Sequence, residues 1–162
     1  MNSEKEFETL ITKHKTNIYM MCYMYAKDKD EANDFFQETL INIWQGFNKF
    51  RAESAVSTWV ARITINTCIS ALRKRKKFSA TIPLTIDMEV LEEDTEQSKQ
   101  IARMHAFINK LGVLDKAFIL LWLDNMSYAE IAEIMGISVS NVSVKLHRIK
   151  EKLKRMSHNQ TD

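Results

Sequence analysis

The sequence predicts an all-α protein made of two small helical domains joined by a flexible acidic linker. First, only three glycines and one proline, the residues that most often interrupt helices, occur among 162 residues. Second, apolar side chains recur every three or four residues, whereas strand-like alternation of useful length is absent. Third, one acidic stretch lacks this periodicity and divides the chain. We therefore place the first domain at 1–78, the linker at 79–98 and the second domain at 99–157.

Three helices are expected in the first domain, at about residues 4–25, 30–47 and 54–77. Apolar side chains lie along one side of the first helix and one side of the second. These are Phe7, Leu10, Ile11, Ile18, Met21, Cys22 and Tyr25, then Ala32, Phe36, Leu40, Ile43 and Phe47. The third helix has apolar residues on two flanks, which predicts burial on both.

The linker contains Pro83, six acidic side chains and no lysine or arginine, a composition typical of a solvated connection. After it, four helices are expected at about 99–111, 114–124, 127–135 and 138–156. Gly46, Gly112 and Gly136 each fall near an expected break between helices.

Composition and spacing argue against a membrane protein, a secreted protein and an enzyme. No apolar run approaches 18 residues and the N-terminus is charged, so neither a membrane span nor a secretory signal is expected. The two cysteines, Cys22 and Cys68, sit within expected helices, which favours buried thiols in a reducing cytoplasm. The four histidines lie in different segments and no glycine-rich phosphate loop occurs. We expect no catalytic activity, no metal and no cofactor.

Residues 127–150 have the pattern of a helix-turn-helix. Ser127 and Glu130 form an S-x-x-E capping box that marks a helix start. Gly136 follows that helix where a reversal needs a residue that accepts positive φ, and Ser138 can cap the next helix. Ala132 is small where the two helices would cross.

The second helix of this motif has an apolar side of Val139, Val142, Leu146, Ile149, Leu153 and Met156. The other side is polar and basic, as expected for a helix that reads the major groove of DNA. An amide such as that of Asn141 suits an adenine edge, and Val144 suits a thymine methyl group. The alternative is a solvated charged surface. The candidate DNA contacts are Ser138, Ser140, Asn141, Val144, Lys145, His147 and Arg148.

The third helix of the first domain carries a polar stripe at helical spacing that begins with an aromatic residue. The stripe consists of Trp59, Arg62, Asn66, Ser70, Arg73 and Lys77, and the basic cluster at its end adds Lys74 and Arg75. The basic cluster should attract phosphate, and an aromatic ring beside it suits unstacked bases of single-stranded nucleic acid. The alternative is that Trp59 packs in the core.

Three stretches together resemble the extracytoplasmic-function (ECF) group of bacterial RNA polymerase sigma factors, in the sigma-70 family. They are DEANDFFQETLINIWQGFNKF, STWVARITINTCISALRKRKK and SYAEIAEIMGISVSNVSVKLHRIKEKL, and the resemblance covers nearly the whole chain in order. It implies a promoter-specificity subunit whose first domain binds core polymerase and the melted minus-ten element. The second domain would read the minus-thirty-five element as duplex. The implied partners are core RNA polymerase, promoter DNA and an anti-sigma factor.

The same resemblance assigns residues to these roles. Asp34, Gln37 and Glu38 match the family's D-x-x-Q-E core-binding signature, and Ile41 extends the same helix face. On a helical wheel, Glu31, Asn42 and Gln45 also belong to the side opposite the apolar one. Residues 48–57 match the family's base-capturing loop, and Trp59 matches the aromatic position beside the point of strand separation. Asn66 matches a common asparagine in the helix that follows the loop.

Three positions depart from the family pattern. Ser70 stands where the family often carries aspartate, so different contacts are expected there, and Ser143 with Val144 implies an altered promoter preference. The competing hypothesis is a helix-turn-helix regulator of the response-regulator type that binds duplex DNA as a dimer. Such a protein would not act as a polymerase subunit.

Overall fold

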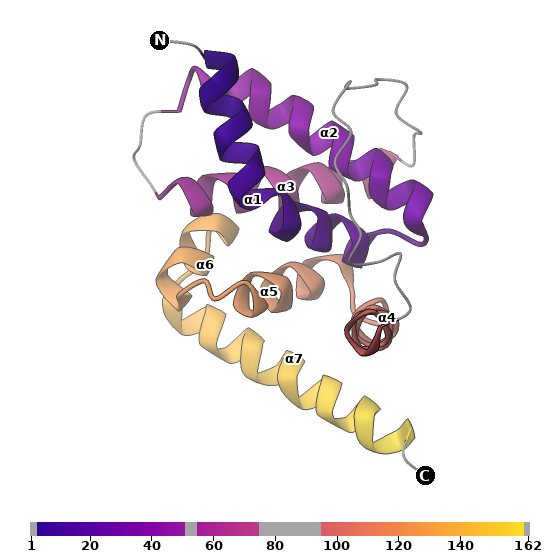
Figure 1. The fold of residues 1–162 in the computed structure, drawn as a ribbon. Helices are drawn as coiled ribbons and strands as arrows, with labels where there is room; N and C mark the ends of the chain where they lie inside the picture. Colours follow the sequence, from indigo (N-terminus) through magenta and orange to yellow (C-terminus); the bar gives the residue numbers. More distant parts are fainter. Residues whose placement is uncertain (1–2, 51–54, 75–94, 161–162) are drawn as a thin grey trace. The chain divides into compact units, whose positions relative to one another are not determined.

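The structure is a computed structural model that describes residues 3–50, 55–74 and 95–160. Within those residues it contains seven α-helices and no strand, which confirms the predicted all-α class (Figure 1). The chain divides into two compact units, Met1–Thr85 and Ile86–Asp162. Among the described helices, none is both long and apolar enough to cross a membrane.

The first unit contains α1 (Ser3–Tyr25), α2 (Lys29–Phe47) and α3 (Val56–Lys74), and each of these helices packs against the other two. Asp28 caps α2 by accepting a hydrogen bond of 2.9 Å from the Glu31 backbone N–H. The expected third helix began at residue 54 and ended at 77, and both of those ends lie outside the described residues.

The core of the first unit is apolar but includes buried threonines, three of which donate hydrogen bonds to the preceding helical turn. Its fully buried side chains include Ile18, Leu40, Ile43 and Ile65. The Thr39, Thr64 and Thr67 hydroxyls donate to the carbonyls four residues earlier at 2.7–2.8 Å, so these polar groups keep hydrogen bonds in the core. The thiols of Cys22 and Cys68 are buried and unbridged, as expected, and their Sγ atoms are 3.9 Å apart.

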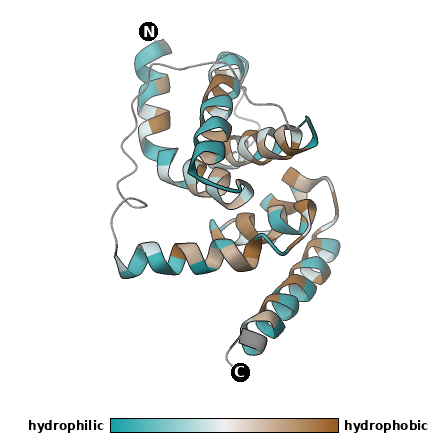
Figure 2. Cartoon of the chain, turned by 90° about the vertical axis from the view of Figure 1, so that its right-hand side faces the viewer, coloured by the Kyte–Doolittle hydropathy of each residue, from teal (hydrophilic) through white to brown (hydrophobic). Residues whose placement is uncertain are grey.

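The second unit contains α4 (Glu96–Ile108), α5 (Val113–Leu123), α6 (Tyr128–Met135) and α7 (Val139–Gln160). Helix α7 packs against the other three and buries Val142, Leu146 and Ile149. In Figure 2, brown and teal bands alternate along this helix, which ends near the C-terminus, because apolar residues recur at helical spacing.

Helix α4 begins earlier than the sequence reading expected, inside the range given to the linker. The Thr95 hydroxyl accepts from the Ser98 N–H at 3.1 Å, and the Ser98 hydroxyl oxygen accepts from the Thr95 N–H at 3.0 Å. This reciprocal capping box satisfies two backbone donors and starts the helix at Glu96. The acidic composition of this stretch led to its assignment to the linker, although Thr95 and Ser98 are suited to cap a helix.

The connection between α6 and α7 is the predicted helix-turn-helix. Ser127 and Glu130 exchange the two hydrogen bonds of the capping box, at 2.9 and 3.1 Å. Gly136 has φ +70°, a left-handed conformation that costs other residues about 1–2 kcal/mol. The Ser138 hydroxyl accepts from the Asn141 N–H at 3.1 Å, as expected for a cap of α7. One expectation is wrong: Val139 was placed on the apolar side, but it is 49% exposed because it lies in the first turn.

Candidate polymerase and promoter interfaces

One candidate surface lies on α2 and consists of Asp34, Gln37, Glu38, Ile41 and Trp44; we call it the α2 surface. Its first four members are half-buried, so Ile41 is less exposed than the sequence reading assumed. Trp44 is 40% exposed, and its ring meets that of Phe7 from α1 edge-on at 4.9 Å between centroids. Sequence reasoning missed Trp44, although its spacing of three from Ile41 could have indicated a shared face.

Asn42 does not belong to the exposed side of α2, contrary to expectation. Its side-chain amide donates a hydrogen bond of 2.8 Å to the Thr67 hydroxyl on α3. Asn42 therefore joins α2 to α3 across the helix interface. The exposed side of α2 is narrower than predicted because it does not include Asn42.

The polar stripe of α3 lies largely on the protein surface. Asn66, Ser70, Arg73 and Lys74 are exposed, whereas Trp59 and Arg62 are half-buried. The two flanks are apolar and mostly buried, with Val60 on one and Ile65 and Cys68 on the other. The structure thus brings the described stripe residues to one accessible side, as expected. Arg75 and Lys77 lie outside the described residues.

The Trp59 ring is neither packed fully inside nor fully exposed. It lies against the Phe50 ring, with centroids 4.7 Å apart and planes tilted by 34°. A Cβ added at Gly46 would lie 3.3 Å from the Trp59 Cζ2 atom, a tight contact. Gly46 lies in the last turn of α2, near the expected break, and it makes room for the ring. Of the expected base-capturing loop, residues 51–54 lie outside the described range.

The outer side of α7 presents every residue that the sequence reading assigned to DNA contact. Each of the following is exposed: Ser138, Ser140, Asn141, Val144, Lys145, His147 and Arg148. Val144 has 48% of its surface exposed, which is high for an apolar side chain. The Lys145 ammonium lies 5.7 Å from the centroid of the Phe118 ring, so a cation–π contact links α7 to α5.

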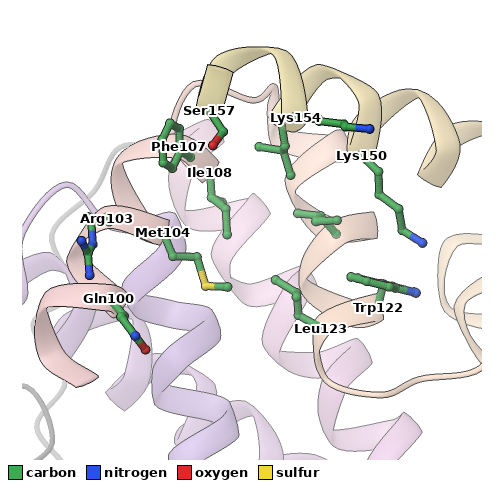
Figure 3. A pocket seen from close by; sticks show the side chains of 12 residues that line it. Gln100, Arg103, Met104, Phe107, Ile108, Trp122, Leu123, Lys150, Lys154 and Ser157 are labelled. Carbon is green, nitrogen blue, oxygen red and sulfur yellow. The ribbon is translucent and has the colours of Figure 1, made fainter. Parts of the chain in front are cut away.

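A further surface of the second unit was not predicted. It is an apolar groove of about 580 Å³ between α4, α5 and α7 (Figure 3). Met104, Phe107, Trp122, Leu123 and Leu153 line it, and Arg103, Lys150 and Lys154 bring basic groups to it. The Lys150 ammonium lies 3.8 Å from the Trp122 ring centroid. Because the lining comes from three helices, no single periodic pattern in the sequence indicates it.

Asp124, the C-cap residue of α5, has a carboxyl group with a raised pKa. Burial, and secondly the negative charge of Glu130, raise the pKa of Asp124 from 3.8 to about 6. In the part of the chain that the structure describes, no group of three or more His, Cys, Asp or Glu side chains could hold a metal ion.

Comparisons with known proteins agree with this two-part arrangement. The family model for Sigma-70 region 2 matches residues 10–78, and the model for Sigma-70, region 4 matches residues 99–153. The RNA polymerase sigma factor SigV of Bacillus subtilis is 30% identical, with 86% of this chain and 84% of SigV covered. The ECF RNA polymerase sigma factor SigW of Bacillus subtilis is also 30% identical, over 92% of this chain and 87% of SigW.

The chain belongs to the ECF group of sigma-70 family sigma factors. It is a sigma subunit of RNA polymerase, not a dimeric regulator that acts without the polymerase. Two solved structures share the fold at 19% identity. CnrH in complex with the cytosolic domain of CnrY has a TM-score of 0.73 and covers 96% of this sigma factor and 90% of that chain. RpoE of Bartonella quintana, with the anti-sigma factor NepR, has a TM-score of 0.71 and covers 95% and 98%.

The raised pKa of Asp124 predicts a pH-dependent stability for this sigma factor. The folded chain keeps the Asp124 proton to a higher pH than the unfolded chain does. Stability from this group is therefore greatest below pH 3.8 and is lost as pH rises through about 6. We expect Asp124→Asn to be more stable than the native chain at pH 7.5 and to show a smaller fall in unfolding free energy between pH 5 and 7.5. Urea unfolding followed by circular dichroism measures both.

Asp115→Asn changes the acidic residue in the first turn of α5, whereas Asp124 caps the end of that helix; it is the matched control and should leave that fall unchanged. An unaltered pH dependence in Asp124→Asn would contradict the assignment.

Proposed function

We propose that this sigma factor contacts promoter DNA with two separate helical faces and core polymerase with a third. In this proposal α3 binds the melted minus-ten strand, α7 reads the minus-thirty-five duplex, and the α2 surface binds the polymerase. The observation that carries the proposal is the exposure of the complete candidate face on α7, with Val142, Leu146 and Ile149 of the same helix buried. We further propose a cytoplasmic protein without catalytic activity of its own.

On α7 the chemistry suits reading of the major groove. Asn141 lies in the first turn, where the amide side chain can reach base edges, and Val144 offers methyl groups one turn later. Lys145, His147 and Arg148 follow and would contact phosphates or base edges. Ser138 and Ser140 supply hydroxyl groups at the beginning of the helix.

On α3 the exposed stripe suits a separated strand. Asn66 and Ser70 offer hydrogen bonds without charge, and Arg73 and Lys74 offer cations for phosphate oxygens. Trp59 and Arg62 lie at the opposite end of the stripe, where a ring and a guanidinium group can stack on an unpaired base. Arg75 and Lys77 remain assigned to this face from their positions in the sequence.

The α2 surface combines two carboxylates with apolar groups that keep partial exposure. Asp34 and Glu38 are four residues apart and so neighbour each other, while Ile41 and Trp44 extend the surface along α2. Partly exposed apolar side chains bordered by charges are typical of a protein-binding surface. This combination supports contact with core polymerase here.

We also propose that a helical segment of an anti-sigma factor occupies the groove between α4, α5 and α7. The structural neighbours CnrH and RpoE were each solved with such a partner, the cytosolic domain of CnrY and NepR. The groove has an apolar lining, and Arg103, Lys150 and Lys154 are basic, so the fitting segment is an amphipathic helix with acidic flanks.

The α2 surface gives a direct test of polymerase binding. We expect Asp34→Lys with Glu38→Lys to weaken the affinity of the full chain for purified core polymerase about tenfold or more. Each lysine would place a positive charge where the proposal has a carboxylate facing a complementary positive charge of the polymerase. Equilibrium titration of labelled chain measures the affinity. Glu6→Lys with Glu8→Lys, two exposed acids on α1, is the charge-matched control and should keep native affinity. Native affinity in the α2 variant would refute this interface.

The α7 face is tested by run-off transcription with core polymerase on a library of random promoters. Asn141→Ala should relax the preference at one base pair by about 1–3 kcal/mol, because a specific base contact is lost. Arg148→Ala should weaken all promoters about equally and make binding less dependent on salt, because it removes a phosphate contact. Identical base preferences in the native chain and Asn141→Ala would exclude the proposed reading by this residue.

The groove is tested by recovering the chain from its native cells. Leu123→Asp places a charge on a groove side chain that is 38% exposed, so the folded chain should lose an anti-sigma partner that the native chain retains. Leu114→Asp, at a 56% exposed position outside the groove, is the matched control. The recovered partner must inhibit initiation when purified. Equal recovery and inhibition with both variants would argue that the partner binds elsewhere.

A further inference from the structure

Two residues outside α3 lie against the ring of Trp59: Gly46, in the last turn of α2, and Phe50, just after α2. Phe50 lies against the ring at 4.7 Å between centroids, within the 4.5–7 Å range of attractive aromatic pairs. Gly46 lies beside its Cζ2 atom, where a Cβ would be 3.3 Å away. Both contacts come from outside α3, which carries Trp59 in its first turns.

Gly46 does not have a backbone conformation that requires glycine. It lies in the last turn of α2, where the backbone is still helical and alanine favours a helix more than glycine does. Its φ is not in the left-handed region, since Gly136 is the glycine with positive φ among the described residues. The close approach of Trp59 therefore accounts for the missing side chain at this position.

The held ring still keeps partial exposure, and it lies at one end of the exposed α3 stripe. A tryptophan in a first helical turn, without neighbours, can rotate among several side-chain conformers. Stacking on a nucleobase requires one particular orientation of the ring plane. Phe50 limits rotation by covering part of the ring, and Gly46 lets the ring settle against the α2 backbone.

We propose that Gly46 and Phe50 are positioning residues that orient Trp59 to stack on an unpaired base of the melted minus-ten strand. This inference rests on the proposed function of the α3 stripe. It adds that the stacking surface is built jointly by α2, the residue Phe50 and α3, so that changes at residues outside α3 alter strand opening. Because every base has a π-face, the surface takes unpaired bases with little sequence preference.

The test compares initiation on two templates that carry a promoter selected by the native chain with core polymerase. One template is fully duplex, and the other has a mismatched, already open minus-ten region. On the open template at saturating polymerase, initiation does not depend on the energy gained by stacking. The measured quantity is the ratio of initiation rates, duplex over open, and permanganate reactivity of unpaired thymines reports opening directly.

We expect Phe50→Ala to lower this ratio about 2- to 12-fold, the effect corresponding to loss of an aromatic pair. Phe50→Tyr keeps the ring and should stay within about twofold of native. Gly46→Ala should lower the ratio while initiation on the open template stays native, because its Cβ, 3.3 Å from the Trp59 Cζ2 atom, displaces the ring. A merely structural role would instead lower Tm and initiation on both templates together.

Phe47→Ala is the matched control for loss of an aromatic ring at the end of α2. Its ring meets Phe7 at 6.1 Å, so its loss should lower stability but leave the duplex-to-open ratio at the native value. The proposal is overturned if Phe50→Ala and Gly46→Ala keep the native ratio, or if Phe47→Ala lowers it equally. A native chain that binds core polymerase yet selects no promoter from a random library would overturn the proposed function as well.

Discussion

The packing of α3 against both α1 and α2 is the constraint on which the nucleic-acid face of the first unit depends. Two flanks of α3 are apolar and mostly buried, so the helix cannot rotate without exposing Val60 on one flank or Ile65 and Cys68 on the other. The Asn42 amide bonded to the Thr67 hydroxyl adds a directional contact between α2 and α3. The remaining side, with Asn66, Ser70 and Arg73, is thereby held outward.

Helix α7 contributes to two surfaces of the second unit, and its orientation is likewise fixed by buried apolar side chains. Val142, Leu146 and Ile149 are buried, which leaves Asn141, Val144 and Arg148 exposed on another side. Farther along the helix, Lys150, Leu153 and Lys154 line the groove with residues of α4 and α5. Because the DNA face and the groove lie on different sides of one helix, a segment in the groove does not cover the DNA face directly.

Gly46 and Gly136 have different structural roles. Gly136 provides a backbone conformation, the left-handed turn that sets the direction of α7 after α6. Gly46 provides space for the Trp59 ring in an otherwise regular helix. In the first case the need is local, whereas in the second it arises from a residue 13 positions later in the sequence. Both glycines lie near helix ends, as the sequence indicated, but only the tertiary structure shows that Gly46 also makes room for a ring.

The sequence by itself determined the helices, the helix-turn-helix and the polar sides of α3 and α7. Their signals are local: apolar spacing of three or four, and caps such as Ser127 with Glu130, act between residues within one or two helical turns. The order of its motifs also sufficed to indicate the sigma family. Only the tertiary structure decided that Asn42 faces Thr67, that Trp59 lies on Gly46 and Phe50, and that Met104, Trp122 and Leu153 line one groove. Those contacts join different helices, and the packing of whole helices, which no local pattern encodes, brings them together.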